Sequence, residues 1–327
     1  MYRKILVTGA TGLVGSALVP RLAAAGQAVV RLGRQASRGK PGAAEGSSGP
    51  NVADFAWDPD RGQIDAAALD GVDAAVHLAG ENIGTGRWTA AKKARILDSR
   101  VKGTRLLCES LAALAQRPRV LVSASATGYY GSRGTEVMTE ESSAGSGFLA
   151  DVCRQWEAAA APAEKSGLRV VRIRFGVILS PAGGALAKML PPFRLGMGGK
   201  VGNGKQYLSW IALEDAVSAI CHALETESLS GPINAVTPYP VTNEEFTKAL
   251  GRVLARPTML PMPAFAARMA FGEMADETIL SSTRAQPAKL LSTGFKFRLP
   301  ELEGALTELI KNGGRIESPP RDSASDS

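Results

Sequence analysis

The chain of 327 residues is about twice as long as a usual domain, so it forms one large domain or a domain with a smaller companion. It carries 38 Lys and Arg against 31 Asp and Glu, a formal charge of +7, and 45% of its residues are hydrophobic. This composition excludes disordered, collagen-like and coiled-coil chains. No apolar run approaches the roughly 18 residues of a membrane span. We therefore expect an unexported, cytoplasmic protein that binds no membrane.

The cysteines and the basic residues exclude further classes. Cys108, Cys153 and Cys221 are odd in number and widely spaced, which favours free thiols in a reducing compartment. With only two isolated histidines besides, no metal site is expected. The basic residues are spread along the chain without zinc-finger spacing or an aromatic-interleaved RNA motif, so we expect no nucleic-acid partner. A small-molecule substrate is expected instead, and a homodimer is left open.

Short β-branched runs alternate with amphipathic helical stretches between Lys4 and about Arg174. The predicted strands are residues 4–8, 28–32, 74–78, 119–123 and 168–174. A helix over 13–25 should end before Gly26, and leucines recur at helical spacing between 106 and 114. This alternation predicts an α/β fold with a doubly wound parallel sheet.

The composition of the sequence changes past Ile178, where Pro- and Gly-rich connections separate the predicted helices. We predict a first domain over 1–178, with part of the sheet extending to about 236, and a smaller, mainly helical C-terminal substrate lobe over 179–312. Residues 35–51 should form a surface loop and 313–327 a disordered tail. Thr242 and Glu245 form a capping box, which predicts a helix running towards Leu254.

The strongest chemical signal is a Gly-x-x-Gly-x-x-Gly turn at Gly9, Gly12 and Gly15. Gly9 permits the tight turn, Gly12 lets backbone N–H groups approach a pyrophosphate at the helix N-terminus, and Gly15 lets the helix pack closely on the strand. A plain turn with a helix-packing glycine is the alternative. The turn nevertheless stands between a predicted strand and a predicted helix, as the dinucleotide fingerprint requires, and so we predict a Rossmann-type domain.

The end of the second strand indicates which dinucleotide binds. A carboxylate there binds the ribose 2′-OH of NAD, whereas an arginine accommodates the 2′-phosphate of NADP. This chain has no carboxylate between Gly9 and Glu45. We therefore predict NADP, with Arg34 as the 2′-phosphate clamp and Gly33 giving access to the backbone. A solvated surface charge is the alternative for the arginines here, and it fits Arg31 better than Arg34.

Small residues follow the predicted strand 74–78, at a carboxyl end where α/β sheets bind ligands. Leu78 and Ala79 should flank the adenosine or ribose of the cofactor. His77 is expected to be a packed strand residue, because nothing near it in sequence would orient it as a base.

Several segments together resemble one family, the extended short-chain dehydrogenase/reductases. The resemblance is to its atypical epimerase-like group of nucleoside-diphosphate-sugar epimerase or SulA-like proteins, which carry a C-terminal domain of unknown function. It covers nearly the whole chain. The matching segments are residues 8–15, 77–83, 87–88, 98–100, 123–131, 156–157, 174–179, 202–215 and 294–295.

The resemblance implies a set of cofactor-binding residues. These are Gly9, Thr11, Gly12, Leu13, Val14, Gly33, Arg34, Leu78 and Ala79, with Arg100 reaching the cofactor from the following helix and Ile178 lying by the nicotinamide. A solvated basic face shared with Lys92 and Lys93 is the alternative for Arg100.

Hydride chemistry in the wider superfamily uses Ser or Thr, a Tyr that transfers a proton, and a Lys that lowers its pKa and holds the ribose. Ser125 matches the serine. The usual Tyr-x-x-x-Lys falls on Leu149 and Cys153, neither of which can do that work. Tyr129 and Tyr130 are the nearby substitutes, and we predict Ser125 and Tyr130 as the catalytic residues. A packed aromatic is the alternative for Tyr130.

The sequence thus predicts an NADP(H)-binding oxidoreductase or epimerase-like enzyme that acts on a small hydroxylated or nucleotide-sugar-like substrate. Residues 206–210, with Arg194, Lys200 and Lys205, resemble the region that holds a nucleotide-sugar diphosphate in extended family members. The alternative is a non-catalytic NADP(H)-bound regulatory or scaffold protein, because proton-transfer groups are missing at 149 and 153.

Overall fold

The computed structural model describes residues 2–34 and 51–311. Within these ranges, one large sheet has the strand order β12-β8-β6-β5-β1-β2-β3-β4. Its strands are β1 (Lys4–Thr8), β2 (Ala28–Arg34), β3 (Val52–Asp58), β4 (Gln63–Ile64), β5 (Ala74–His77), β6 (Val120–Ala126), β8 (Arg169–Phe175) and β12 (Gly231–Ala235). All neighbours are parallel except β3 and β4. The order reverses between β1 and β5, and ligands of such sheets bind at the carboxyl ends there.

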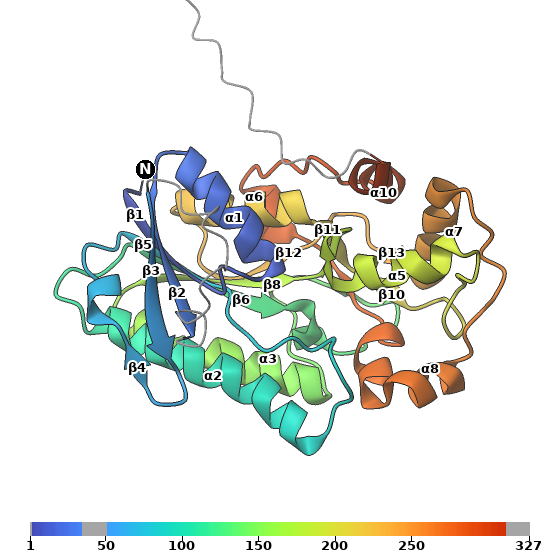
Figure 1. The fold of residues 1–327 in the computed structure, drawn as a ribbon, viewed down its shortest axis with the longest axis horizontal. Helices are drawn as coiled ribbons and strands as arrows, with labels where there is room; N and C mark the ends of the chain where they lie inside the picture. The colour runs from blue at the N-terminus through green and yellow to red at the C-terminus, as the bar shows by residue number, and fades with distance from the viewer. Residues whose placement is uncertain (1, 35–50, 312–327) are drawn as a thin grey trace, which may run out of the picture.

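Helices cover both faces of this sheet (Figure 1). One face carries α1 (Leu13–Ala24) and α6 (Leu213–Glu225), and the other carries α2 (Ala90–Ala112), α3 (Phe148–Ala158) and α4 (Ala161–Lys165). Along β1, Ile5 and Val7 belong to one buried cluster and Leu6 to the other, and all three are 0% exposed. A strand buried on both sides reads as a continuous apolar run. The predicted doubly wound α/β fold is confirmed.

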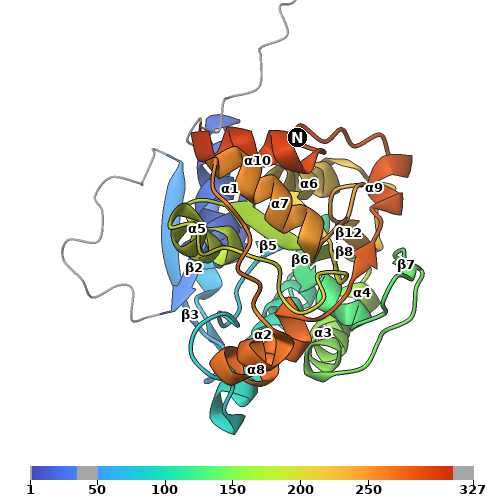
Figure 2. The same ribbon diagram turned by 90° about the vertical axis from the view of Figure 1, so that its right-hand side faces the viewer.

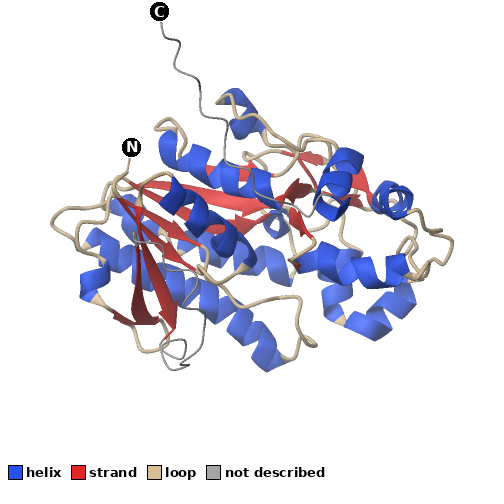
Figure 3. Cartoon of the chain, turned by 45° about the horizontal axis from the view of Figure 1, so that its top comes forward, coloured by secondary structure: helices blue, strands red, loops and turns tan. Residues whose placement is uncertain are grey.

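The second lobe is mainly helical (Figures 2 and 3). Its helices are α5 (Gly184–Arg194), α7 (Asn243–Leu254), α8 (Ala264–Phe271), the π-helical η4 (Ala275–Ile279), α9 (Ala288–Ser292) and α10 (Leu302–Lys311). Short two-stranded ladders join the lobe together: β9 (Val177–Ser180) with β11 (Trp210–Ala212), β10 (Tyr207–Leu208) with β13 (Val241–Thr242), and β7 (Val137–Met138) with β14 (Arg284–Ala285). Short 3-10 turns, η2 (Ala66–Ala68) and η3 (Thr127–Tyr130), complete the elements. Trp210 and Phe246 lie at the centre of the lobe's own apolar core.

Two local signals in the sequence gave helix ends correctly. The predicted capping box forms at α7, where the Glu245 N–H donates to Thr242 Oγ1 at 3.2 Å and the Thr242 N–H donates to Glu245 Oε2 at 2.7 Å. Gly26 follows α1 with φ of +81°, a left-handed conformation that favours glycine. Helix α7 therefore begins at the predicted capping box, and α1 ends just before the glycine predicted to follow it.

Two features concern the extent of the sheet. Strand β3 was not predicted, whereas β12 lies within the predicted extension of the sheet to about residue 236. Asp215 lies in the first turn of α6, and its buried carboxylate accepts the N–H groups of Arg298 and Leu299 at 2.8 and 2.9 Å. The expected loop over 35–51 lies, except for Asn51, outside the described residues, as does the expected tail over 313–327.

Candidate functional site

The glycine turn lies against the backbone that follows β5. Gly9 has φ of +68°, and a Cβ at this position would lie 2.7 Å from both the Ala79 nitrogen and the Leu78 carbonyl carbon. Only glycine therefore satisfies both the conformation and the close approach. The structure brings three predicted cofactor residues together here, at the point where the strand order reverses.

The N-terminus of α1 follows the turn with its first N–H groups uncapped. Gly12 is the N-cap residue and offers no side-chain acceptor, and the first turn holds no acidic residue. Thr11 and Gly12 are exposed, while Leu13 and Val14 are partly buried. Such an end attracts a phosphate because free N–H groups and the positive end of the helix dipole coincide.

Gly15 has a different role from the expected one. A Cβ here would lie 2.3 Å from the carbonyl oxygen of Gly9 and 2.7 Å from Ala10 Cα. Gly15 therefore lets α1 pack on the turn itself, rather than on the strand as the sequence suggested. The turn keeps its shape only if both glycines are present.

Ile178 lies at the same edge of the molecule as the turn. A Cβ on Gly183 would be 3.2 Å from Leu13 Cδ1, and a Cβ on Gly184 would be 3.3 Å from Leu13 Cδ2 and 3.5 Å from the Ile178 carbonyl oxygen. The side chain of Leu13 thus spans from α1 to the segment after β9. The sequence-predicted positions 13 and 178 are neighbours across this edge.

The end of β2 presents Gly33 and Arg34. Arg34 pairs in register with Trp57 of β3, is exposed, and takes part in none of the ion pairs formed among residues 2–34 and 51–311. The space beside Gly33 is open, because a Cβ there would meet nothing within 4 Å. Arg31 instead pairs with Asp54 at 2.5 Å, in keeping with a surface role.

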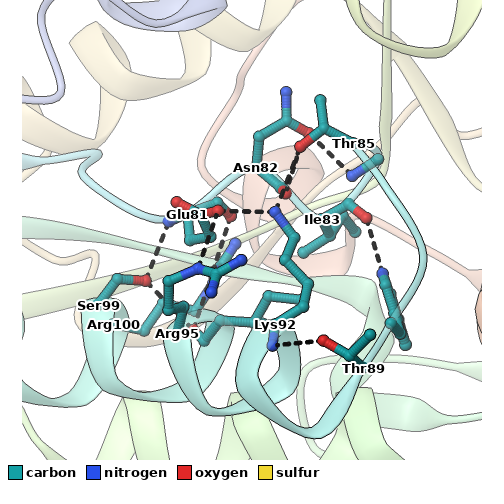
Figure 4. A network of polar contacts seen from close by, with 12 residues as sticks. Glu81, Asn82, Ile83, Thr85, Thr89, Lys92, Arg95, Ser99 and Arg100 are labelled. Atoms are coloured by element: carbon teal, nitrogen blue, oxygen red, sulfur yellow. Dashed lines mark hydrogen bonds and ion pairs between the residues drawn. The ribbon is translucent and has the colours of Figure 1, made fainter.

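A polar network that the sequence analysis missed holds the connection from β5 to α2 (Figure 4). The Lys92 ammonium is 2.6 Å from Glu81 Oε1 and donates to Thr85 Oγ1 at 3.2 Å, and the Glu81 N–H donates to Ser99 Oγ at 3.0 Å. The hydrogen bond from Lys92 holds the Glu81 pKa below its ordinary value, and the charge of Arg34 acts in the same direction. Lys92 is only 5% exposed, so it does not belong to a solvated basic face.

Arg100 packs beneath the same connection. A Cβ on Gly80 would lie 3.3 Å from its guanidinium carbon, and its Nη1 donates to the carbonyls of Glu81 at 3.1 Å and Ile96 at 3.0 Å. The guanidinium also lies 4.9 Å from the centroid of the Trp156 ring. The structure thus brings Arg100 to the backbone adjoining the glycine turn.

Ser125, at the carboxyl end of β6, belongs to a buried polar chain. Its hydroxyl donates to Glu157 at 2.7 Å, and Arg174 donates to both Glu157 oxygens at 2.8 Å. A further Arg174 N–H reaches the Tyr130 hydroxyl at 3.0 Å, and that hydroxyl donates to Asn234 at 2.7 Å. These five residues join α3 to strands β6, β8 and β12.

Tyr130 does not fit the catalytic role expected from the sequence. It is 0% exposed, both of its hydrogen bonds are to protein, and burial raises its pKa to about 12 against the opposing effect of Arg174. Arg174 and Asn234 engage the hydroxyl, and the packed-aromatic alternative describes Tyr130 better. Tyr129 is only partly buried. The guanidinium carbon of Arg174 lies over the Tyr129 ring, 3.5 Å from the ring centroid. Ser125 is also buried, at 3% exposure, and its catalytic role stays a prediction.

Leu149 and Cys153, at the positions of the missing Tyr-x-x-x-Lys pair, lie close to Gly128 in the turn η3. A Cβ on Gly128 would lie 3.4 Å from Leu149 Cβ and 3.8 Å from Cys153 Sγ. Burial raises the pKa of Cys153 to about 12, with Glu157 adding to the effect. The thiol therefore stays protonated at neutral pH, as expected of a buried helix residue rather than a nucleophile.

His77 is a packed strand residue, as predicted. It is 0% exposed, and its ring nitrogens lie 2.7 Å from Thr8 Oγ1 and 2.9 Å from Thr104 Oγ1. Burial lowers its pKa to about 4. Across the described part of the chain no group of His, Cys, Asp or Glu residues could hold a metal ion.

This burial predicts an acid sensitivity. As the pH falls below 6.5, His77 binds a proton in the unfolded chain, but in the folded chain it does so only near pH 4. Stability that is present above pH 6.5 is therefore lost as the pH falls. The expected loss is about 3 kcal/mol by pH 4. Urea unfolding between pH 7 and about pH 4 measures this loss, and His77→Asn, which does not titrate, should show a weaker dependence of stability on pH. Equal slopes for the two proteins would contradict this account.

The fold and the glycine turn define a dinucleotide-binding α/β protein. Comparisons with known proteins show to which family it belongs. The model of the NAD dependent epimerase/dehydratase family matches residues 5–236, and a domain of unknown function, DUF1731, matches residues 262–309. The chain belongs to this epimerase/dehydratase family. None of the helices in the described ranges is long and apolar enough to cross a membrane.

Individual relatives align over most of their length. The chain is 45% identical to epimerase family protein Mb2239 of Mycobacterium bovis over 293 residues, 90% of this chain and 93% of the relative. It is similar to the crystal structure of human epimerase family protein SDR39U1 with NADPH, with a TM-score of 0.83, 34% identity, and coverage of 94% and 99%. A UDP-glucose 4-epimerase from Thermotoga maritima shares the fold alone, at 18% identity and a TM-score of 0.73, covering 94% and 97%.

Proposed function

We propose that this protein binds NADP(H) and is an oxidoreductase or epimerase-like enzyme acting on a small hydroxylated or nucleotide-sugar-like substrate. The observation that carries the proposal is the cradle of Gly9 against Leu78 and Ala79, which leads into the uncapped N-terminus of α1. The similar human protein was crystallised with NADPH, which supports the choice of cofactor.

The residues present fit such a cofactor. The exposed backbone of Thr11 and Gly12 would receive the diphosphate, while Gly33 and Arg34 would receive the adenosine end. Arg34 has the charge and exposure to pair with a 2′-phosphate. When bound, the nicotinamide supplies hydride exchange. Ile178, across the edge from Leu13, would exclude water from that end of the cofactor.

The choice between NADPH and NADH is directly testable. Replacing Arg34 with alanine removes the charge opposite the 2′-phosphate and should weaken NADPH binding roughly tenfold while leaving NADH nearly unchanged. Nicotinamide fluorescence titrations of both cofactors measure this, and Arg31→Ala is the matched control because Asp54 engages that arginine. If neither cofactor binds the natural protein, the proposed function is wrong. If Arg34→Ala keeps the preference, the clamp lies elsewhere.

A second function is favoured by one observation: apolar Leu149 and buried Cys153 face Gly128 where a proton-transferring pair is usual. A non-catalytic NADP(H)-bound regulatory or scaffold protein would bind the cofactor without turnover. A screen of hydroxylated compounds and nucleotide sugars, followed at the NADPH absorbance, separates the two. Turnover that Ser125→Ala abolishes supports the enzyme, and tight binding without turnover supports the regulator.

The free cysteines in the described ranges support the cytoplasm as the place of action.

A further inference from the structure

Most of the large apolar side chains that the described ranges expose gather on one face of the second lobe. They come from the segment after α5 and from the segment that leads into and through α8. The members of this apolar face are Leu195, Met197, Met259, Leu260, Met262, Phe265 and Met269. Their exposed fractions lie between 38% and 84%, so together they present roughly 800 Å², at about 200 Å² for a fully exposed side chain. The largest apolar patch on a typical monomer covers about 300–600 Å², and a larger one marks a surface where another molecule docks.

Backbone contacts hold the two segments side by side. The Met262 N–H donates to the Lys200 carbonyl at 2.9 Å, and the Gly202 N–H donates to the Met262 carbonyl at 2.8 Å. A Cβ on Gly196 would lie 3.6 Å from Pro257 Cγ. The connection from α7 to α8 runs down one side of the molecule in Figure 1, and Figure 2 looks onto that side. The members of the apolar face therefore lie on one side of the molecule, with α8 at its end.

Helix α8 turns its larger apolar side chains away from the protein. The buried residue of this helix is Ala267. Phe265 and Met269 each stand two positions from Ala267, and residues two positions apart point to nearly opposite sides of a helix. They are 65% and 71% exposed. Helix α8 therefore presents an apolar ridge to solvent, where a surface helix ordinarily carries polar residues.

A hollow of about 510 Å³ lies beside the C-terminal end of α8. Met269 and Phe271 of α8 line it, together with Trp88 and Arg87 from the connection between β5 and α2. The Arg87 guanidinium donates to the Met269 carbonyl at 2.5 Å, which fixes this wall of the hollow. Phe265 projects from the same helix one turn before Met269. An aromatic side chain seated in a hollow is a common anchor of protein interfaces, so α8 carries both an anchor and a place to receive one.

The charges next to α8 are mostly paired within the chain. Arg268 Nε lies 2.9 Å from Asp276 Oδ1, and Lys93 Nζ lies 2.7 Å from Glu273 Oε1. Charges that are already paired offer little attraction to an acidic peptide or to an anionic membrane. Apolar contacts and the hollow are therefore what this part of the face offers to a partner.

We propose that the apolar face binds a second copy of the chain, with α8 antiparallel to α8 of the partner subunit about a two-fold axis near Ala267. Phe265 of the partner subunit then lies over Met269 at the hollow, and the same contact repeats across the axis. A two-fold interface needs such a self-complementary surface, because each copy supplies both halves of every contact. Roughly 800 Å² on each copy is about what one partner contributes to an interface of standard size. Arg194 and Arg256, which adjoin each other at the far end of the apolar face, stay at the solvated rim.

The mass of the full chain in solution tests the proposal. In sedimentation velocity over a series of protein concentrations, the natural protein should sediment with twice the mass of one chain. The α8 variant, Phe265→Ser/Met269→Ser, loses the projecting ring and one wall of the hollow, and its self-association should be weaker by at least roughly 100-fold. Leu291→Ser is the matched control, because Leu291 of α9 is 48% exposed but lies outside the apolar face, and it should leave the dimer unchanged. Circular dichroism verifies that each variant is folded.

Each outcome decides on the proposed dimer whether or not the protein binds NADPH. A dimer that the folded α8 variant loses and Leu291→Ser keeps supports the proposal. A natural protein with the mass of one chain at every concentration overturns it, and the apolar face then serves another molecule. A dimer that persists in the folded α8 variant also overturns it, because a different face then joins the copies. If the α8 variant does not fold, Met259→Ser/Leu260→Ser takes its place, since both residues are exposed on the same face outside helices and strands.

Discussion

Replacing Arg174 with methionine should lower the free energy of unfolding by about 3–5 kcal/mol. Arg174 is 3% exposed and Glu157 is 8% exposed, and two hydrogen bonds of 2.8 Å join them. Without the guanidinium, the carboxylate keeps a buried charge whose remaining partner is the Ser125 hydroxyl. Tyr130 also loses a donor to its hydroxyl, which adds to the cost.

Urea unfolding followed by tryptophan fluorescence measures the effect, and two companion variants show its cause. Ser125→Ala removes one hydrogen bond and should cost only about 1 kcal/mol. Arg174→Met/Glu157→Leu removes both charges and should be more stable than Arg174→Met alone, because no unpaired ion stays buried. A double variant as unstable as the single one would mean that lost packing, rather than the stranded carboxylate, sets the cost.

The fold was predictable wherever the sequence carries a local pattern. Strand β1 is a run of apolar residues closed by a glycine turn, and the Thr242 and Glu245 pair marks the start of α7 by itself. Strand β3 escaped prediction although its Phe55 and Trp57 alternate with smaller residues. Asp54 interrupts that run, and its pairing with Arg31 of β2 is a contact that neither segment indicates alone.

The candidate site was predictable to a similar limit. The glycine spacing and the small residues after β5 place Gly9, Leu78 and Ala79 at one edge, because parallel strands align their carboxyl ends. The Tyr130 hydroxyl is engaged by Arg174 of β8 and Asn234 of β12, which lie far from it in the sequence. A local sequence pattern cannot predict such contacts. The pairing of Lys92 with Glu81 is equally a product of the folded connection.

The largest effect on cofactor binding is expected from Gly9→Ala. Its Cβ would be placed 2.7 Å from the backbone at Leu78 and Ala79, so either the turn or the end of β5 must move. Because this backbone is the cradle itself, NADPH affinity should fall at least roughly 100-fold, about 2.7 kcal/mol. Fluorescence titration measures the affinity, and circular dichroism verifies that the variant is folded.

Gly26→Ala is the matched control for the strain of a left-handed alanine. Gly26 has φ of +81°, similar to the +68° of Gly9, but a Cβ there would meet nothing within 4 Å. Both variants should lose about 1 kcal/mol of stability from conformation alone. Gly26→Ala should nevertheless bind NADPH as the natural protein does, because Gly26 lies at the opposite end of α1 from the turn. If the two variants bind equally well, the close approach of Gly9 to residues 78–79 does not shape the cofactor site. If only Gly9→Ala loses binding, the cradle is the place where the dinucleotide is held.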